Sequence, residues 1–334
     1  MLRFVVRRLA LMVPVLVGLS ILLFVWIRAL PGDPARAMLG QRATPEGIER
    51  VNELYGFEDP VLQQYFTYVG RLIKGDFGES TRNGDPVVTT FFDQFPATME
   101  LAFAALLFAI VLGVPLGYWA GRRVGGWLDN LIVSSSLLGV VTPVFFLAIL
   151  LKLVFAEWLD WFPTSRRQDA RIEATHVTNF YVLDGIITRE WDAAWDAIMH
   201  LILPGLALGT IPLAIIVRIT RAAVADVISE DYVRTAYSKG LDPAIIRNRH
   251  VMRNALLPVV TTIGLQTGLL LSGAVLTESV FEIGGIGRYL FEAISQRDYP
   301  VLQAYILFIA LIFSLVNLLV DVSYGVIDPR VRVS

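Results

Sequence analysis

The chain of 334 residues has no cysteine, only three histidines and few charged residues, 17% of the total. Without cysteine it forms neither disulfides nor thiolate metal sites. His176, His200 and His250 are widely separated and show no metal-ligand spacing. The chain also lacks a G-x-x-x-x-G-K-[ST] motif and any Gly-Lys dipeptide, so it has no P-loop for nucleotide phosphates. We therefore expect no enzyme, no cofactor and no metal.

Apolar residues are abundant. They make up 55% of the chain, with a mean hydropathy of +0.61, whereas soluble domains contain about 45–50%. A membrane span requires about 20 apolar residues, and six segments approach that length: 9–30, 97–120, 131–156, 200–217, 255–277 and 301–320. The sequence therefore predicts an all-α polytopic membrane protein with six transmembrane helices. The first segment is longer than the apolar core of a signal peptide, about 7–15 residues, so we expect a retained anchor.

The distribution of Lys and Arg predicts the orientation in the membrane. Fourteen of these residues lie in the short segments 1–8, 121–130 and 218–254 and after residue 320. Twelve lie in the three longer loops between the spans. Short loops rich in Lys and Arg remain in the cytoplasm, so both termini are predicted to be cytoplasmic. The net charge of −2 gives no reason to expect a nucleic-acid partner.

Ionisable residues occur in the predicted spans only near their ends. They are Arg28, Glu100, Lys152, His200, Glu278 and Asp321. A proton-driven transporter would place carboxylates or histidines along the interior of the membrane. The sequence therefore gives little support to an ion-coupled secondary transporter, which stays as an alternative function. No inverted hydropathy repeat supports it either. Pro143, Pro204 and Pro212 lie within spans, where they act either as static kinks or as hinges.

Two amphipathic helices are predicted in the long loop after the first span. Thr44 is a suitable N-cap with Pro45 at the first helical position, and this helix should end at Gly56. A second apolar pattern runs from Pro60 to Lys74. These helices are expected to lie on the membrane surface or to cover the outer mouth formed by the spans. We predict two domains: residues 1–96, an anchor helix with this extracytoplasmic loop, and residues 97–334, the core.

The charged stretch 218–258 contains helix-boundary signals. A helix is predicted from about Glu230 to Lys239, where Gly240 is placed to end it. Asp242 and Pro243 then supply the N-cap and first position of a second helix, predicted to continue to about His250. Two interpretations remain for this helical platform, residues 230–250. It either rests on anionic lipid or binds a partner protein in the cytoplasm.

The platform resembles the "EAA" loop of bacterial ABC-importer permeases, in the peptide-importer form R-T-A-x-x-x-G that runs from Arg234 to Gly240. It departs from the general pattern in having Arg-Thr for Glu-Ala and a longer spacing between Gly240 and Pro258, as in the peptide branch. Further motifs of the dipeptide/oligopeptide (peptide/nickel) family match at 30–34, 75–80, 201–204, 217–221, 278–288, 297–300 and 328–330. The chain is most similar to the B-type dipeptide permeases of that family.

This resemblance implies a type I ABC-importer permease in the inner membrane of a bacterial cell. Such a subunit forms half of the pathway for di- or oligopeptides, although nickel chelates, glutathione or haem are alternative cargoes. The implied partners are a second homologous permease, two ATP-binding subunits or domains, and an extracytoplasmic peptide-binding protein. Substrate-binding residues are not implied, because the binding protein is expected to select the cargo. The residues implied in coupling to the ATPase are Arg234, Thr235, Ala236, Lys239, Gly240, Asp242 and Pro243.

Overall fold

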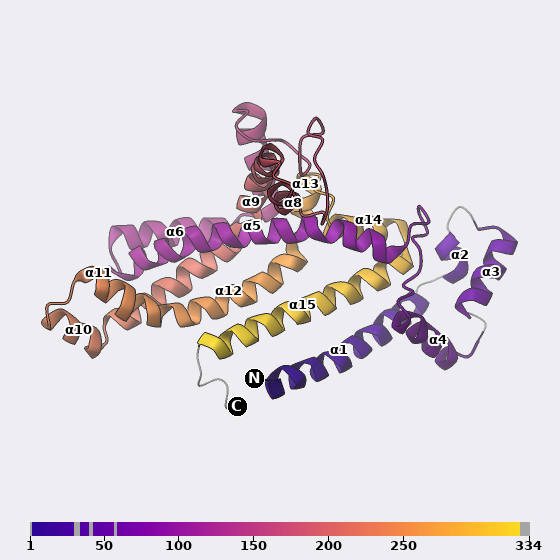
Figure 1. Cartoon of the computed structure of the whole chain (residues 1–334), viewed down its shortest axis with the longest axis horizontal. Coiled ribbons are helices and arrows are strands. Elements are labelled where there is room, and N and C mark those ends of the chain that lie inside the picture. Colours follow the sequence, from indigo (N-terminus) through magenta and orange to yellow (C-terminus); the bar gives the residue numbers. More distant parts are fainter. Residues whose placement is uncertain (1, 30–33, 40–42, 57–58, 328–334) are drawn as a thin grey trace. The chain divides into compact units, whose positions relative to one another are not determined.

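The structure, a computed structural model, describes residues 2–29, 34–39, 43–56 and 59–327. Every regular element in this part of the chain is helical (Figure 1), which confirms the all-α class. Contacts divide the chain into two units, which are described separately. Unit 1 combines Met1–Phe95 with Gly285–Leu318, and unit 2 combines Pro96–Gly284 with Leu319–Ser334. The predicted domain boundary after residue 96 stays a prediction.

Unit 1 contains the N-terminal helices, the start of α5 and most of the last helix. Its elements are α1 (Leu2–Ala29), α2 (Pro34–Leu39), α3 (Pro45–Tyr55), α4 (Val61–Ile73), α5 (Val87–Gly121, shared with unit 2), α14 (Ile286–Gln296) and α15 (Tyr299–Ile327). Unit 2 contains α6 (Trp127–Val141), α7 (Val144–Leu151), π-helical η2 (Lys152–Trp158), α8 (Tyr181–Ile187), α9 (Trp191–Ile228), α10 (Asp231–Ser238), α11 (Pro243–Ile245), π-helical η3 (Ile246–Met252), α12 (Arg253–Gly273) and α13 (Val275–Val280).

Four helices among the described residues are long and apolar enough to cross a membrane: α1, α5, α9 and α15. A fifth span is possible if α6 and the helix that follows it form one broken span, which bends by 101°. The bend falls at Pro143, where Thr142 is extended because a following proline disfavours helical geometry. Pro143 therefore breaks the predicted segment 131–156. The segment predicted at 255–277 covers most of α12 and the start of α13. Over its described residues α12 does not meet the same criterion, so six spans stay a prediction.

The helix α9 is longer than the span predicted at 200–217. It has 38 residues and continues to Ile228. No proline or glycine occurs between Val217 and Ile228, and three alanines favour the helix. Residues 218–228, about the first quarter of the charged stretch 218–258, are therefore the end of a helix.

Glycines allow α5 and α9 to approach closely in unit 2. Gly113, Gly117 and Gly121 are four residues apart and so lie on one face of α5. A Cβ atom at Gly117 would lie 2.7 Å from the Val217 carbonyl oxygen, and one at Gly121 would lie 2.6 Å from that of Arg221. Real Cβ atoms do not come this close. Small residues thus permit backbone contact between the two helices.

The local signals in the long N-terminal loop are confirmed. The Thr44 hydroxyl accepts a hydrogen bond from the Gly47 N–H at 3.1 Å, and α3 ends at Gly56 in the left-handed region, with φ +64°. The helix α4 matches the pattern predicted from 60 to 74. It packs on α1 through Tyr65, whose hydroxyl lies 2.9 Å from the Ser20 hydroxyl and whose ring meets Phe24 edge-on.

Two of the family motifs meet inside unit 1. The Ser80 hydroxyl, at the end of motif 75–80, donates a 2.5 Å hydrogen bond to the Asp298 carboxylate in motif 297–300. Both side chains are buried. Asp298 follows Arg297, which ends α14 in the left-handed region with φ +57°. This contact joins segments that are 218 residues apart. The motifs at 30–33 and 328–330 lie outside the described residues.

We expect Ser80→Ala to destabilise unit 1. It removes the donor from a buried carboxylate, and a buried charged acceptor left without a partner costs about 1–3 kcal/mol. The measurement is thermal unfolding of the purified protein in detergent. Ser295→Ala is the control, because this serine is exposed on α14. Equal melting temperatures for the two variants would contradict a stabilising role of the Ser80–Asp298 contact.

We also expect Gly117→Ala to lower stability by about 1–3 kcal/mol, because the added methyl group overpacks the interface between α5 and α9. Gly139→Ala is the matched control. Its Cβ would lie 3.5 Å from its nearest neighbour, an ordinary contact, and alanine favours helix. Thermal unfolding in detergent compares the two. A Gly117→Ala protein as stable as the Gly139→Ala protein would show that the contact is not tight.

Candidate functional site

The predicted platform lies at one end of unit 2, whereas α8 and α13 lie at the other end (Figure 1). The helix α10 covers Asp231–Ser238, close to the predicted 230–239. Its buried residues are Val233 and Ala236, three positions apart, so they share one face. The opposite face is exposed. The helix is therefore amphipathic, as a short helix needs to be in order to pack on a larger body.

Gly240 ends α10 as predicted. Its φ is +70°, in the left-handed region, and a Cβ there would meet nothing within 4 Å. The N–H of Gly240 donates to the Tyr237 carbonyl at 2.9 Å, and that of Leu241 donates to the Ala236 carbonyl at 3.3 Å. This is the hydrogen-bond pattern of a Schellman motif. The backbone conformation, rather than lack of space, requires glycine.

Asp242 and Pro243 begin the second helix as predicted. The Asp242 carboxylate accepts a hydrogen bond from the Ala244 N–H at 2.7 Å, and Pro243 is the first helical residue. The helix does not end near His250, however. After α11 it continues through π-helical η3 into α12, because no glycine or proline interrupts residues 244–257. The second platform helix is thus the beginning of a long helix.

An apolar cluster fixes the platform to α9. Its buried members are Val224, Val233, Ala236, Ile246, Val251 and Ala255. Tyr118 at the end of α5 also packs against it. The Tyr232 hydroxyl accepts a 2.8 Å hydrogen bond from the Asn254 amide, which ties α10 to α12. Buried contacts on several elements make the platform a rigid extension of the helices.

Six of the seven predicted coupling residues are exposed, and one is buried. The exposed residues are Arg234, Thr235, Lys239, Gly240, Asp242 and Pro243. Ala236 is only 4% exposed and belongs to the apolar cluster, so its side chain can position the platform but does not face a partner. Arg234 lies 3.7 Å from Asp231 in an exposed ion pair. Pairs of this kind contribute little to stability.

The platform also exposes apolar side chains that the sequence analysis did not single out. Tyr237 is 58% exposed, Leu241 38% and Ile245 47%. They surround the turn at Gly240 and lie among exposed charges. The presence of large apolar residues within an otherwise charged segment is the signal that could have identified them. Such a mixed apolar and charged surface is typical of protein interfaces.

A second ion pair near the platform was not predicted. Arg221 in α9 forms a two-pronged ion pair with Asp129, which is buried at the start of α6. The Asp129 carboxylate also accepts a 2.7 Å hydrogen bond from the Gly125 N–H. An aspartate among the arginines of segment 121–130 was the available signal. The pair holds the turn between α5 and α6 against α9.

Nothing in the described residues groups three or more His, Asp or Glu side chains as a metal site. The arrangement is instead that of apolar helices with an exposed platform at one end. Residues 113–333 match the family described as the binding-protein-dependent transport system inner membrane component. The chain belongs to this family. Residues 1–102 match a second family model, which describes the N-terminal part of the binding-protein-dependent transport system membrane component.

Several relatives of this permease are similar along almost their whole length. The dipeptide transport system permease protein of Alkalihalophilus pseudofirmus is 44% identical over 99% of this chain and 100% of the relative. That of Escherichia coli K12 is 41% identical over 99% of both chains. A glutathione transport system permease protein of Escherichia coli is 37% identical over 99% of both chains. The permease is thus a multi-pass inner-membrane protein, and an ion-coupled secondary transporter is not favoured.

We expect Gly240→Val to destabilise the platform locally, because a β-branched residue in the left-handed region costs about 1–2 kcal/mol. Amide hydrogen exchange of α10 should become faster, while exchange in α9 stays unchanged. Gly240→Asn is the control, since asparagine tolerates this conformation. Equal exchange in the valine and asparagine variants would contradict the need for a left-handed residue.

Proposed function

We propose that this permease forms half of the pathway of an ATP-driven importer for di- or oligopeptides. We further propose that its platform binds an ATP-hydrolysing subunit. The observation that carries this proposal is the exposed surface around Gly240, where basic and apolar side chains stand on a rigid base. In water such a surface is stabilised by a partner that covers it. The chain has no P-loop, so the ATP-binding site belongs to that partner.

The platform is suited to transmit motion. Its apolar cluster includes Val224 of α9 and Ala255 of α12, so a displacement of the platform must move both helices or break buried contacts. ATP shifts the permease between inward-open and outward-open states only if the ATP-bound partner binds one state more tightly. In this scheme the ATPase sets the state, and the helices carry the change across the membrane.

The assembly that we propose contains more chains than this one. A second homologous permease completes the pathway, two ATP-binding subunits or domains bind the platforms, and an extracytoplasmic binding protein delivers the peptide. Both termini of this chain then lie in the cytoplasm, on the side of the platform. Relatives named for dipeptides and for glutathione support small peptides as cargo, glutathione being a tripeptide derivative.

The test is peptide-stimulated ATP hydrolysis by the reconstituted importer. We expect Arg234→Glu to lower the stimulated rate about tenfold or more, because reversal of a charge at an interface adds repulsion and leaves its partner unpaired. Arg50→Glu, a reversal at an exposed position on α3, should leave the rate unchanged. Normal stimulation in both the Arg234→Glu and the Gly240→Val complexes would overturn the coupling assignment.

A further inference from the structure

Unit 2 contains a cleft between residues 160–171 and the first turns of α9. Its volume of about 730 Å³ lies within the range of about 300–1,000 Å³ that is usual for ligand sites. A 2.8 Å hydrogen bond from the Arg166 N–H to the Phe281 carbonyl holds the loop 160–171 beside the end of α13. The cleft therefore belongs to the end of unit 2 that lies away from the platform (Figure 1).

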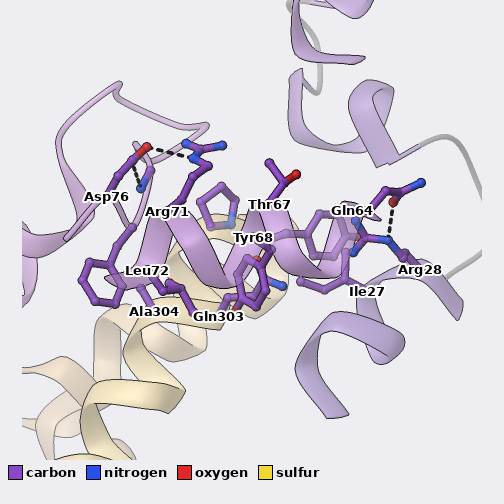
Figure 2. A pocket seen from close by; sticks show the side chains of 14 residues that line it. Ile27, Arg28, Gln64, Thr67, Tyr68, Arg71, Leu72, Asp76, Gln303 and Ala304 are labelled. Carbon is purple, nitrogen blue, oxygen red and sulfur yellow. Dashed lines mark hydrogen bonds and ion pairs between the residues drawn. The ribbon is translucent and has the colours of Figure 1, made fainter. Parts of the chain in front are cut away.

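The recess between α1, α4 and α15 in unit 1 is much smaller (Figure 2). Its volume is about 50 Å³, which is room for a few water molecules. Its arginines are also engaged, since the Arg28 guanidinium donates to the Gln64 side chain and the Arg71 guanidinium donates to the Asp76 carboxylate, both at 2.8 Å. The cleft of unit 2 is therefore the better candidate for a ligand site.

His200 is a nearly buried polar group in the wall of the cleft. Its side chain is only 6% exposed. The Nδ1 atom lies 2.8 Å from the Asp196 carbonyl oxygen, which can only accept, so in the neutral ring Nδ1 carries the proton and Nε2 is an acceptor. No described residue forms a hydrogen bond with Nε2. A nearly buried acceptor in the wall of a cleft calls for a donor, such as the ammonium or amide N–H of a ligand.

Charges of both signs line the cleft. The Asp196 carboxylate lies 3.4 Å from His200 Nδ1 and accepts a 2.8 Å hydrogen bond from the Asp169 N–H, so it fixes the loop to α9. Arg166 and Arg171 on the loop are exposed, and neither guanidinium has a hydrogen-bond or ion-pair partner in the part of the chain that the structure describes. Arg166 has φ +74°, where glycine would cost less. Both guanidinium groups are thus available to a carboxylate.

The lining of the cleft suits a ligand that has both charges and an apolar part. Carboxylate and imidazole acceptors recognise an ammonium group, and arginines recognise a carboxylate. Trp161, Phe162 and Met199 add apolar surface to the same lining, and methionine adapts to groups of varied shape. A phosphate or a polyamine would use charges of only one sign. A free di- or tripeptide uses all three features.

We propose that this cleft binds free di- and tripeptides, with the amino group at His200 and Asp196 and the carboxylate at Arg166 and Arg171. The choice of a peptide rests on the proposed function, whereas the preference for a zwitterion rests on the cleft itself. With the platform in the cytoplasm, the cleft lies on the opposite side, where the binding protein releases its peptide. The permease then holds the peptide at its own surface before the pathway opens.

The test is isothermal titration calorimetry of the full chain in detergent with the dipeptide Ala-Phe and with Ala-Phe-amide, which has no carboxylate. We expect the double variant Arg166→Gln, Arg171→Gln to bind Ala-Phe about tenfold more weakly, because charge-assisted hydrogen bonds are lost, and to bind the amide like the wild type. Arg189→Gln is the matched control. Arg189 is also exposed, has φ +64° and does not line the cleft, so the affinity for Ala-Phe should be unchanged.

Variants of His200 test the other end of the peptide. His200→Phe removes the acceptor and should lower the affinity for Ala-Phe about tenfold. His200→Gln supplies an acceptor again and should recover most of the affinity. Thermal unfolding without peptide shows whether each variant is folded, so that lost binding is not mistaken for lost structure.

Three results would overturn the proposed site. They are no binding of Ala-Phe to the wild type, equal affinity of the wild type for Ala-Phe and its amide, and an unchanged affinity of the double arginine variant for Ala-Phe. None of these results bears on the coupling of the platform to an ATPase. That proposal fails instead if the Arg234→Glu and Gly240→Val complexes keep normal peptide-stimulated ATP hydrolysis.

Discussion

The close contact between α5 and α9 is the constraint on which the rest of unit 2 depends. In a bilayer, helices gain little from burying apolar side chains, so close packing of backbones has to supply the association. Gly117 and Gly121 make this possible because any side chain would meet backbone oxygens of α9. The platform stands on the same two helices, where Tyr118 and Val224 join its apolar cluster. The rigidity of the platform therefore begins with these glycines.

Unit 1 depends on a buried polar contact, whereas unit 2 depends on close packing of two helices at glycines. Ser80 and Asp298 are buried together, and their segments frame a core that includes Phe91 and Tyr305. A buried carboxylate needs its donor, so the two segments are mutually dependent. Both were singled out in the sequence as separate family motifs. Their contact gives a physical reason why both are present.

The two faces of the platform have different roles. Val233 and Ala236 face inward and hold it on α9, while Arg234 and Lys239 face outward. The motif from Arg234 to Gly240 thus contains residues of two kinds, one for attachment and one for contact. Tyr237, Leu241 and Ile245 extend the outward surface. Only the outward residues are placed to contact the proposed ATPase, and the inward residues attach that surface to the helices.

The sequence by itself determined the helical class, the caps at Thr44, Gly240 and Asp242, and the family. Caps and apolar runs are local, because each depends on residues within one or two helical turns. The tertiary structure decided that Ala236 faces inward, where it packs in the apolar cluster with Val224 of α9. It also brought Ser80 to Asp298 and Arg221 to Asp129. Such contacts depend on which helix faces pack together, and periodicity along one helix carries no information about its neighbour.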